Sequence, residues 1–359
     1  MAAAGGPPGM RELRNISDAA GIVVLSACAV WSLITAASRQ GRPEGVLLAV
    51  LAVGAGYACG RITGALLPVG APCVGALAGL LFAATSPPAA PGPDMASPLG
   101  DAGATAALLA LSTGAACCAA WAAEQAALRI ALRLLAAGIV VAAATLGSTA
   151  GFVACVGVLL YSLAAARMRR RGLALAGLGG ATAVVTGLSW AVTEGVLPDG
   201  LTISLEGQLT EHRILLWRDA LDLAGQEPFL GVGPGRFGEL SPTVAQTLVA
   251  DGRPHSAPLQ QAAEQGIVGV SLLAAVFCWL LYALWRSPRA TPVAVTAGAA
   301  LTSLALMALV GNTLSFTTVT AGGGLLAGFA TSRPWGDDLG HGFTGAQERS
   351  ESGTFTEGR

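Results

Sequence analysis

Charge is scarce in this chain of 359 residues, and lysine is missing altogether. Only 11% of the residues are charged, about half the fraction typical of a soluble domain. All 20 basic residues are therefore arginines, and 21 acidic residues bring the net charge to −1. Because a nucleic-acid-binding surface needs a strong basic excess, this balance argues against nucleic acid as a partner.

Histidine is rare, and no two cysteines are spaced as a CxxC pair. The three histidines are scattered, so no cluster has the ligand spacing of a metal site. The seven cysteines form no CxxC pair and all fall inside apolar stretches, which predicts buried thiols that act as small hydrophobic residues. We therefore expect neither a metal ion nor another cofactor.

Long apolar runs make up most of the chain. Hydrophobic residues account for 53% of it, in runs long enough to span a bilayer and separated by short polar breaks. This pattern predicts an all-α, polytopic integral membrane protein with about ten transmembrane helices. The fifth and sixth runs are short and could instead form one long broken helix. The expected spans are residues 19–37, 45–60, 64–84, 104–123, 132–146, 151–166, 172–193, 264–285, 292–312 and 315–331.

The placement of arginine predicts the orientation of these helices. The cluster "RMRRR" (167–171) is typical of a short cytoplasmic loop. With that loop inside, fourteen arginines fall on the cytoplasmic side and six on the other. Both termini would then be cytoplasmic, and no cleavable signal peptide is recognised. The absence of lysine and the abundance of Ala and Gly are typical of a GC-rich bacterial genome, so we expect a bacterial plasma membrane.

Five parts make up the predicted organisation. Residues 1–18 and 333–359 have the composition of disordered cytoplasmic ends. Residues 19–193 would form a transmembrane bundle of about seven spans, and residues 261–332 one of about three. Between them, residues 194–260 form the only long polar stretch, which we expect to be an extracytoplasmic loop. Four of the six outward arginines lie in it, against the positive-inside bias, so the loop is the expected catalytic segment.

The loop contains a predicted amphipathic helix, "TEHRILLWRDALDLAG" (210–225). Thr210 is a suitable N-cap and Gly225 a suitable stop. An apolar stripe would lie on the membrane or on the bundle, and it consists of Ile214, Leu215, Trp217, Leu221 and Ala224. Arg213 and Trp217, four residues apart, share one face. Either they form a cation–π contact that anchors the helix, or Arg213 is presented to a phosphate.

A glycine-rich segment, "EPFLGVGPGRFGE" (227–239), follows. It contains a formal GxGxxG from Gly233 to Gly238, but no βαβ unit surrounds it, so we reject a dinucleotide site. The glycines instead predict a tight turn with positive φ that folds the loop back over the bundle. Arg236 on this turn is either solvated or a phosphate contact.

The segment "RPHSAPLQQAAEQGIVG" (253–269) carries a histidine at a predicted helix start. Because proline is tolerated in the first turn, the helix should begin between Ser256 and Pro258. His255 would then lie at the helix N-terminus, where free N–H groups favour an anion and disfavour a protonated imidazole. The ring could therefore act as a base, or it could merely cap the junction of loop and helix.

From Arg213 to Gly269 the chain resembles the O-antigen ligase and Wzy-type polymerase family of membrane glycosyltransferases. The family's order is an arginine, a tryptophan four residues later, "P-x-x-G-x-G-x-G-x-F", and a histidine with a small polar neighbour. The ligase signature (histidine, a polar residue, nine residues, glycine, two residues, glycine) runs from His255 to Gly269 without a gap. The matching residues are Arg213, Trp217, Pro228, Gly231, Gly233, Gly235, Phe237, His255, Ser256, Leu259, Glu264, Gly266 and Gly269.

The resemblance implies a metal-independent, inverting glycosyltransferase of polysaccharide and cell-envelope biosynthesis. Its donor would be a glycan linked to undecaprenyl diphosphate, presented among membrane lipids at the outer face of the membrane. Its acceptor would be a hydroxyl group of a glycan, a lipid or a wall polymer. His255 would be the general base and Arg213 would hold the diphosphate. Substrate contacts would also come from Trp217, Arg218, Arg236, Arg253, Ser256 and Glu264.

One position departs from the family pattern. The family often carries Ser-Arg near the outer end of an earlier span, whereas "TLGSTAG" (145–151) has Thr149 at that place. Either another outward arginine takes over, or donor binding is impaired, which would leave a scaffold or binding protein of the same fold. A transporter is a weaker alternative, because the predicted spans hold few ionisable residues. The candidate replacements are Arg39, Arg42, Arg218, Arg236 and Arg253.

Overall fold

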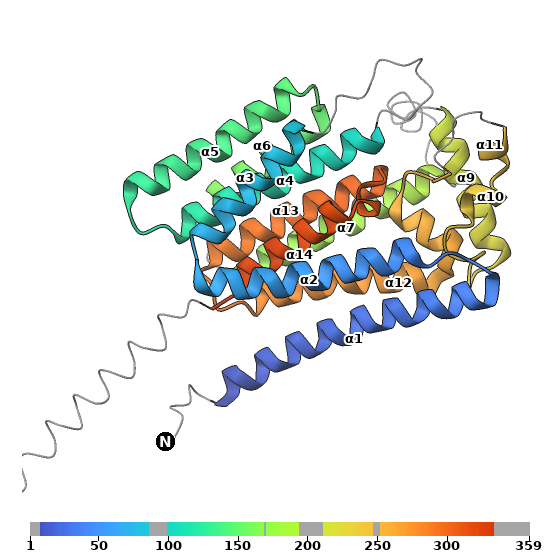
Figure 1. Ribbon diagram of the computed structural model, residues 1–359, viewed down its shortest axis with the longest axis horizontal. Helices are drawn as coiled ribbons and strands as arrows, with labels where there is room; N and C mark the ends of the chain where they lie inside the picture. The colour runs from blue at the N-terminus through green and yellow to red at the C-terminus, as the bar shows by residue number, and fades with distance from the viewer. Residues whose placement is uncertain (1–7, 86–98, 169, 194–210, 247–251, 334–359) are drawn as a thin grey trace, which may run out of the picture.

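The computed structural model describes residues 8–85, 99–168, 170–193, 211–246 and 252–333. All regular structure in these ranges is helical, as the apolar runs predict, and the long helices lie side by side in one elongated bundle (Figure 1). The bundle helices are α1 (Pro8–Arg39), α2 (Glu44–Leu66), α3 (Gly70–Thr85), α4 (Leu99–Ala122), α5 (Ala126–Thr145), α6 (Thr149–Ala165), α7 (Arg171–Thr193), α12 (Ala257–Trp285), α13 (Thr291–Val310) and α14 (Thr317–Thr331).

Each expected span coincides with one of these helices, but not all of them reach the length of a membrane span. Within the described part of the chain, α1, α2, α4, α5, α7, α12 and α13 are long and apolar enough to cross a bilayer. The other three, α3, α6 and α14, have 16, 17 and 15 residues. The alternative of one broken helix is wrong, because a turn at Gly147 (φ 71°) separates α5 from α6.

The first helix starts earlier than expected. It begins at Pro8, so residues 8–18, assigned to a disordered end, are helical, and residues 1–7 lie outside the described ranges. The predicted disordered tail lies outside them too, apart from Arg333.

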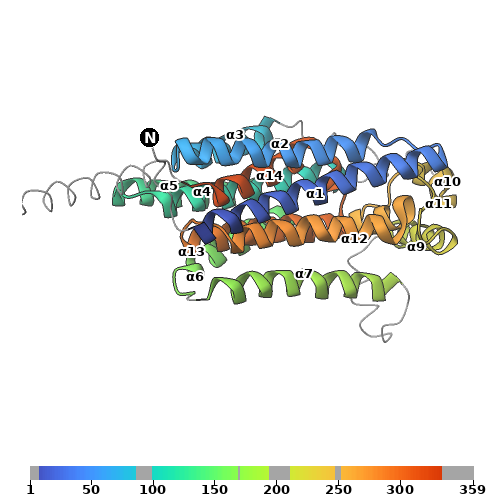
Figure 2. The same cartoon turned by 90° about the horizontal axis from the view of Figure 1, so that it is seen from below.

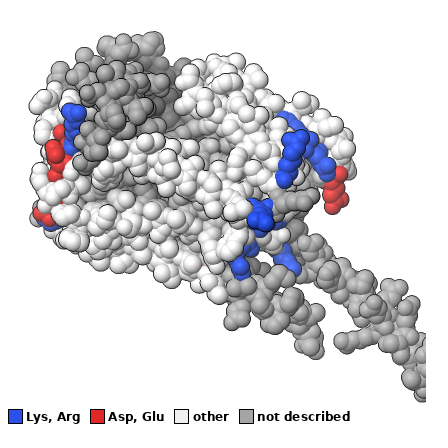
Figure 3. Space-filling model, turned by 180° about the vertical axis from the view of Figure 1, so that it is seen from behind, with Lys and Arg blue, Asp and Glu red and all other residues white. Residues whose placement is uncertain are grey.

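The surface of the bundle is that of a multi-pass membrane protein. Large apolar side chains are more than half exposed along its outer helices, including Ile22, Leu51, Leu134 and Val153. Charged side chains gather at the two ends of the face in Figure 3, with an uncharged band between them. Exposure of so much apolar surface is typical of helices that face lipid.

Glycine lets α2 and α14 approach backbone to backbone. Gly56, Gly60 and Gly64 are buried at four-residue intervals along one face of α2. A Cβ atom on Gly60 would lie 2.2 Å from the carbonyl oxygen of Leu325, and one on Gly328 of α14 would lie 2.4 Å from that of Tyr57. Small residues at such spacing are how helices associate in a membrane, where apolar burial contributes little.

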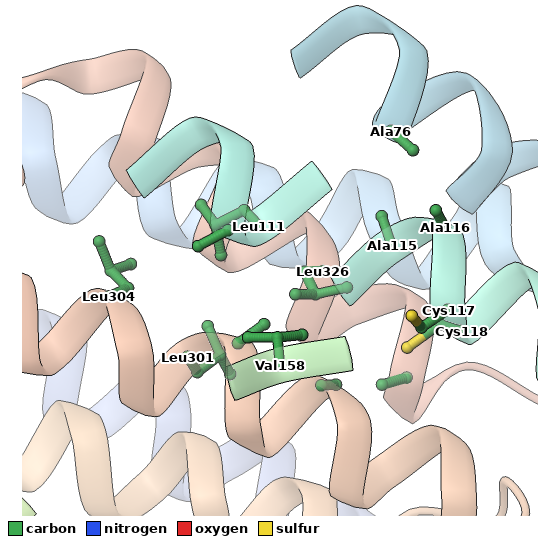
Figure 4. Close-up of a cluster of buried hydrophobic side chains, with 14 of the residues drawn as sticks. Ala76, Leu111, Ala115, Ala116, Cys117, Cys118, Val158, Leu301, Leu304 and Leu326 are labelled. Carbon is green, nitrogen blue, oxygen red and sulfur yellow. The ribbon is translucent and has the colours of Figure 1, made fainter. Parts of the chain in front are cut away.

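Alanine and larger aliphatic side chains fill the centre of the bundle. Leu111 of α4, Val158 of α6, Leu301 of α13 and Leu326 of α14 come together there (Figure 4).

The cysteine prediction holds for four of the seven thiols: Cys28, Cys117, Cys118 and Cys155 are buried, whereas Cys59 and Cys278 are exposed and Cys73 is intermediate.

Arginines secure one end of the bundle, which we call the arginine end. Arg171 donates to the carbonyl oxygens of Trp285 (3.2 Å) and Ser287 (2.7 Å), at the C-terminus of α12. Arg289 donates to the carbonyl oxygens of Gly64 (2.7 Å) and Ser332 (2.9 Å). These guanidinium groups satisfy backbone carbonyls that helix ends leave without partners.

Short helices gather at the opposite end, which we call the loop end. They are α9 (Glu211–Gln226), α10 (Phe237–Leu240), α11 (Pro242–Ala245) and the 3₁₀ turn η1 (Thr313–Ser315). Helices α9 to α11 lie beside the C-terminus of α1 and the start of α12 (Figures 1 and 2). Gly225 is the penultimate residue of α9 rather than a stop after it, and the expected N-cap, Thr210, lies outside the described residues.

Candidate functional site

A break in α12 organises the loop end. Gly266 adopts φ 67° and ψ −164°, so a short segment (residues 257–265) and a long apolar segment (residues 267–285) meet at an angle. In an unbroken helix the carbonyl of Ala263 would accept a hydrogen bond from the N–H of Ile267. The break releases both groups, and each of them needs another partner.

The glycine loop (residues 228–236) supplies those partners. The N–H groups of Val232 and Gly233 donate to the carbonyls of Ala263 (2.8 Å) and Glu264 (2.9 Å), and Ile267 N–H donates to Pro228 O (2.8 Å). This exchange requires the two backbones to touch: a Cβ atom on Gly231 would lie 2.4 Å from the carbonyl carbon of Glu264. Loop and break therefore form one unit.

Positive φ angles shape this loop, as the sequence predicted. Gly231, Gly233 and Gly235 have φ angles of 64°, 106° and 73°. A Cβ atom on Gly269 of α12 would lie 2.4 Å from that of Gln265, so this signature glycine makes room for a neighbouring side chain. The five motif glycines are thus explained by backbone geometry and close approach.

The link between α1 and α2 also packs on the glycine loop. The N–H of Arg42 donates to Pro234 O (2.6 Å), and Arg236 Nη1 donates to Arg39 O (2.9 Å). Arg39 forms an ion pair with Glu227, just before the loop. Arg42 also lies 3.6 Å from a carboxylate oxygen of Glu239. Three candidate replacements for the family arginine, Arg39, Arg42 and Arg236, therefore have partners within the protein.

Helix α9 rests on the bundle rather than on a membrane surface. Leu216, Trp217 and Ala220 are buried against Leu259 and Ala263 in the short segment of α12. Trp217 is only 2% exposed, which rules out an anchor at the membrane surface. Leu215, which the sequence placed on the apolar stripe, is instead exposed.

Arg213 lies one turn before Trp217 and is buried. Its side chain is 8% exposed, and it has neither an ion pair nor a cation–π contact with any described residue. Its Nε has no hydrogen-bond partner there, and burial lowers the pKa of its guanidinium from the ordinary value. A buried cation without an acid beside it is costly, so Arg213 is suited to an anionic ligand.

His255 and Ser256 lie at the start of α12, as the sequence predicted. The helix begins at Ala257 with Ser256 as its N-cap residue and a proline in its first turn. Both side chains are 5% exposed. His255 has a φ angle of 51°, one of two positive values among the described non-glycine residues. Such a conformation persists only where the surroundings impose it.

A cavity of about 680 Å³, the bundle cavity, lies between α1, α2, α12, α13 and α14. Its mouth, at the loop end, is polar and includes Arg42, Glu239, Arg253 and Glu264. Below the mouth the walls are apolar. Along α12 the lining reaches from Gln265 to Leu280, a depth of about 22 Å at the rise of a helix.

Glu264 is the most enclosed acid at this mouth, with 3% exposure. Gln260 Nε2 donates to its Oε1 (3.3 Å), and the backbone N–H groups of Gly235 and Phe237 and the charge of Arg253 act on its carboxyl group. Glu264 thus joins the glycine loop to the cavity wall.

The structure brings together only part of the predicted site. Arg253, Glu264, Gly235 and Gly269 line the bundle cavity. His255 and Ser256 lie in the chain between the lining residues Arg253 and Ala257, and Arg213 and Trp217 are buried on α9.

Two predicted arginines lie elsewhere. Arg218 is exposed on α9, and Arg236 lines a separate pocket of about 450 Å³ with Asp219 and Glu227. Thr149, at the departing position, is exposed as the first residue of α6.

Sequence reasoning missed two contributors to this region. Trp31 of α1 donates its indole N–H to the carbonyl oxygen of Gln265 (3.1 Å), the third carbonyl freed by the break. Gln265 itself lines the cavity. No short-range pattern marks either residue, because the contact joins positions 234 residues apart.

Comparison with known proteins bears on this region directly. No curated protein matches the chain. The family model described as O-Antigen ligase matches residues 131–274, a segment that runs from α5 to the long part of α12 and contains Arg213, the glycine loop and His255. Over this segment the chain is similar to the O-antigen ligase family.

Proposed function

We propose that this protein transfers or polymerises a glycan from a polyprenyl diphosphate, such as undecaprenyl diphosphate, onto a hydroxyl acceptor at the outer face of a bacterial plasma membrane. The match to the O-antigen ligase family over residues 131–274 supports an O-antigen ligase-like membrane enzyme of polysaccharide biosynthesis. The observation that carries the finer proposal is the bundle cavity, which combines a polar mouth with a deep apolar shaft.

The cavity suits an amphiphilic donor. Leu272, Val276 and Leu280 of α12 and Val50 and Val53 of α2 line the cavity, which provides an apolar environment for isoprenoid units. A volume of about 680 Å³ holds part of a long polyprenyl chain, and the rest would lie among membrane lipids. The polar mouth leaves the glycan at the loop end, where an acceptor can approach.

Arg213 is the proposed contact for the diphosphate. A guanidinium group can donate two parallel hydrogen bonds to phosphate oxygens, and it keeps its charge during the reaction. Its burial without an acidic partner among the described residues leaves this capacity available. Negative charge grows on the diphosphate as it departs, so Arg213 would stabilise the transition state more than the bound donor.

His255 is the proposed general base. The acceptor oxygen forms a bond to the anomeric carbon, the bond from that carbon to the phosphate oxygen breaks, and the acceptor proton passes to the imidazole. Attack opposite to the leaving diphosphate inverts the anomeric centre. The chain's own groups supply both the base and the charge stabilisation, so we propose a reaction independent of metal ions.

The orientation that fits this proposal places the loop end outside the cytoplasm. Arg171 and Arg289, together with the predicted positive-inside pattern, favour a cytoplasmic arginine end. Both termini would then be cytoplasmic.

A scaffold without activity is the second candidate, because Thr149 stands where the family often has an arginine. One experiment separates the two functions. Purified protein in detergent is incubated with a polyprenyl-diphosphate glycan and candidate acceptors, with and without EDTA. The enzyme predicts release of polyprenyl diphosphate and a longer or relocated glycan, equally in both conditions. Donor that is bound but never consumed would favour the scaffold.

A further inference from the structure

Gln265 occupies a defined place on the wall of the bundle cavity. It is the last residue of the short segment of α12, directly before the break at Gly266. Its carbonyl oxygen accepts the indole N–H of Trp31 (3.1 Å), and a Cβ atom on Gly231 would lie 2.5 Å from its backbone nitrogen. Contacts with α1 and with the glycine loop therefore fix its position.

The side chain of Gln265 has unused hydrogen-bonding capacity. It is 2% exposed and lines the cavity, yet its amide nitrogen has no hydrogen-bond partner among the described residues. Buried polar groups are nearly always bonded, because an enclosed donor without an acceptor destabilises the fold. A buried donor of this kind in a cavity wall indicates a ligand that supplies the acceptor.

The position of Gln265 along the cavity identifies the chemistry of that acceptor. Towards the mouth, α12 contributes the polar residues Gln260, Gln261 and Glu264. Towards the shaft, every further lining residue of α12 is apolar or glycine, beginning with Gly269 and Leu272. Gln265 is thus the polar residue closest to the apolar shaft on this helix. In a polyprenyl diphosphate, the group at that junction is the phosphate bonded to the prenyl chain.

We propose that the side-chain amide of Gln265 donates a hydrogen bond to the lipid-proximal phosphate of the donor. This inference rests on the proposed function. It means that Gln265 sets how deep in the cavity the phosphate end of the lipid is held. A neutral amide can donate to a phosphate oxygen without competing for the charge that the arginines neutralise.

Binding measurements on the purified full-length protein in detergent test this assignment. The probes are undecaprenyl diphosphate, which carries the phosphates, undecaprenol, which has the same chain without them, and free pyrophosphate. Gln265→Leu preserves approximate size and removes the donor. We expect its affinity for undecaprenyl diphosphate to fall about tenfold to a hundredfold, the usual range for a hydrogen bond to a charged group. Its affinity for undecaprenol should stay within about twofold of the wild type.

Ser271→Ala is the matched control, because Ser271 is exposed on the same helix and its hydroxyl donates to Ile267 O (2.8 Å). It should bind both lipids like the wild type. Equal losses for both lipids in Gln265→Leu would show a packing role and overturn the assignment, as would unchanged binding of undecaprenyl diphosphate. Tighter binding of free pyrophosphate than of the lipid would place the ligand elsewhere. A wild-type protein that binds no undecaprenyl diphosphate would overturn the proposed function as well.

Discussion

At the scale of single residues, the backbone of His255 is the clearest sign of an imposed geometry. A residue with a side chain rarely adopts φ near 51°, and holding it there costs about 1–3 kcal/mol. Asparagine, aspartate and histidine are the residues with a side chain that adopt this conformation most often. Asparagine would therefore fill a plain capping role as well as histidine does.

That comparison gives a test of the proposed base. His255→Asn keeps the backbone conformation and a polar side chain but cannot take a proton. We expect turnover to fall about 10²–10⁴-fold, the usual contribution of a positioned base, while the melting temperature and donor binding stay near those of the wild type. Transfer rates and thermal unfolding of the same preparations provide the measurement. Near-normal turnover by folded His255→Asn would identify a cap.

Arg213 offers a second test, with a matched control on its own helix. Arg213→Lys loses the bidentate fork, and because burial already lowers the pKa of the guanidinium, an ammonium in the same place would also be held less firmly in its charged form. We expect about tenfold to hundredfold weaker donor use, read from kcat/KM. Arg218→Lys, on the exposed surface of α9, should change it less than twofold. Equal effects in the two variants would mean that Arg213 has no special contact.

The sequence allowed some of these residues to be chosen and not others. His255 and Arg213 could be predicted because the order and spacing of the motif residues can be read directly from the sequence. The burial of Arg213 and the exposure of Arg218 depend on which face of α9 packs on α12. The predicted apolar stripe did not identify that face, because it included Leu215, which is exposed. Gln265 lies outside every pattern, since its surroundings come from α1 and from the glycine loop.

At the scale of elements, the glycine loop and the break in α12 exchange hydrogen bonds and should respond to mutation as one unit. Gly266→Ala forces a side chain into positive φ and places its Cβ atom 2.3 Å from Phe229 O. We expect destabilisation by about 1–3 kcal/mol, seen as a lower melting temperature in detergent.

Gly138→Ala is the control for that substitution. Gly138 lies within α5, and a Cβ atom there meets open space, so alanine should be neutral or should stabilise the helix by up to about 1 kcal/mol. If both variants unfolded at the wild-type temperature, the close contact between loop and helix would be refuted.

Apolar periodicity could not reveal the break, because the residues on both sides of Gly266 are compatible with one continuous helix. The same limit explains the first helix, whose polar start from Pro8 was assigned to a disordered end. The presence of each helix could be predicted from its apolar composition. The break could not, because it depends on partners that are distant in the sequence.

At the scale of the whole molecule, the orientation in the membrane is the quantity to measure. Gly225 near the end of α9 and Ala166 beside the basic cluster are both exposed, at opposite ends of the bundle. In a cysteine-free background, Gly225→Cys should react with a membrane-impermeant thiol reagent in intact cells, and Ala166→Cys only after permeabilisation. The reverse pattern would invert the proposed topology and place the cavity mouth in the cytoplasm.

The overall architecture was the most predictable level. Each of the ten apolar runs became a helix in the described part of the chain, as a bilayer requires, but only seven of these helices are long enough to span it. Their packing was not predictable in the same way. The contact between Gly60 of α2 and Leu325 of α14 joins distant parts of the chain, and short helices such as α3 and α6 fall below the length of a full span.

The break in α12 also has a consequence for the order of synthesis. Every group that satisfies it, from Trp31 to Gly233, precedes it in the chain. When α12 leaves the ribosome, its partners have already been made, so the bent helix can be completed as it enters the membrane. A ribosome stalled before α12 would instead leave a finished loop whose N–H groups have no partner in α12.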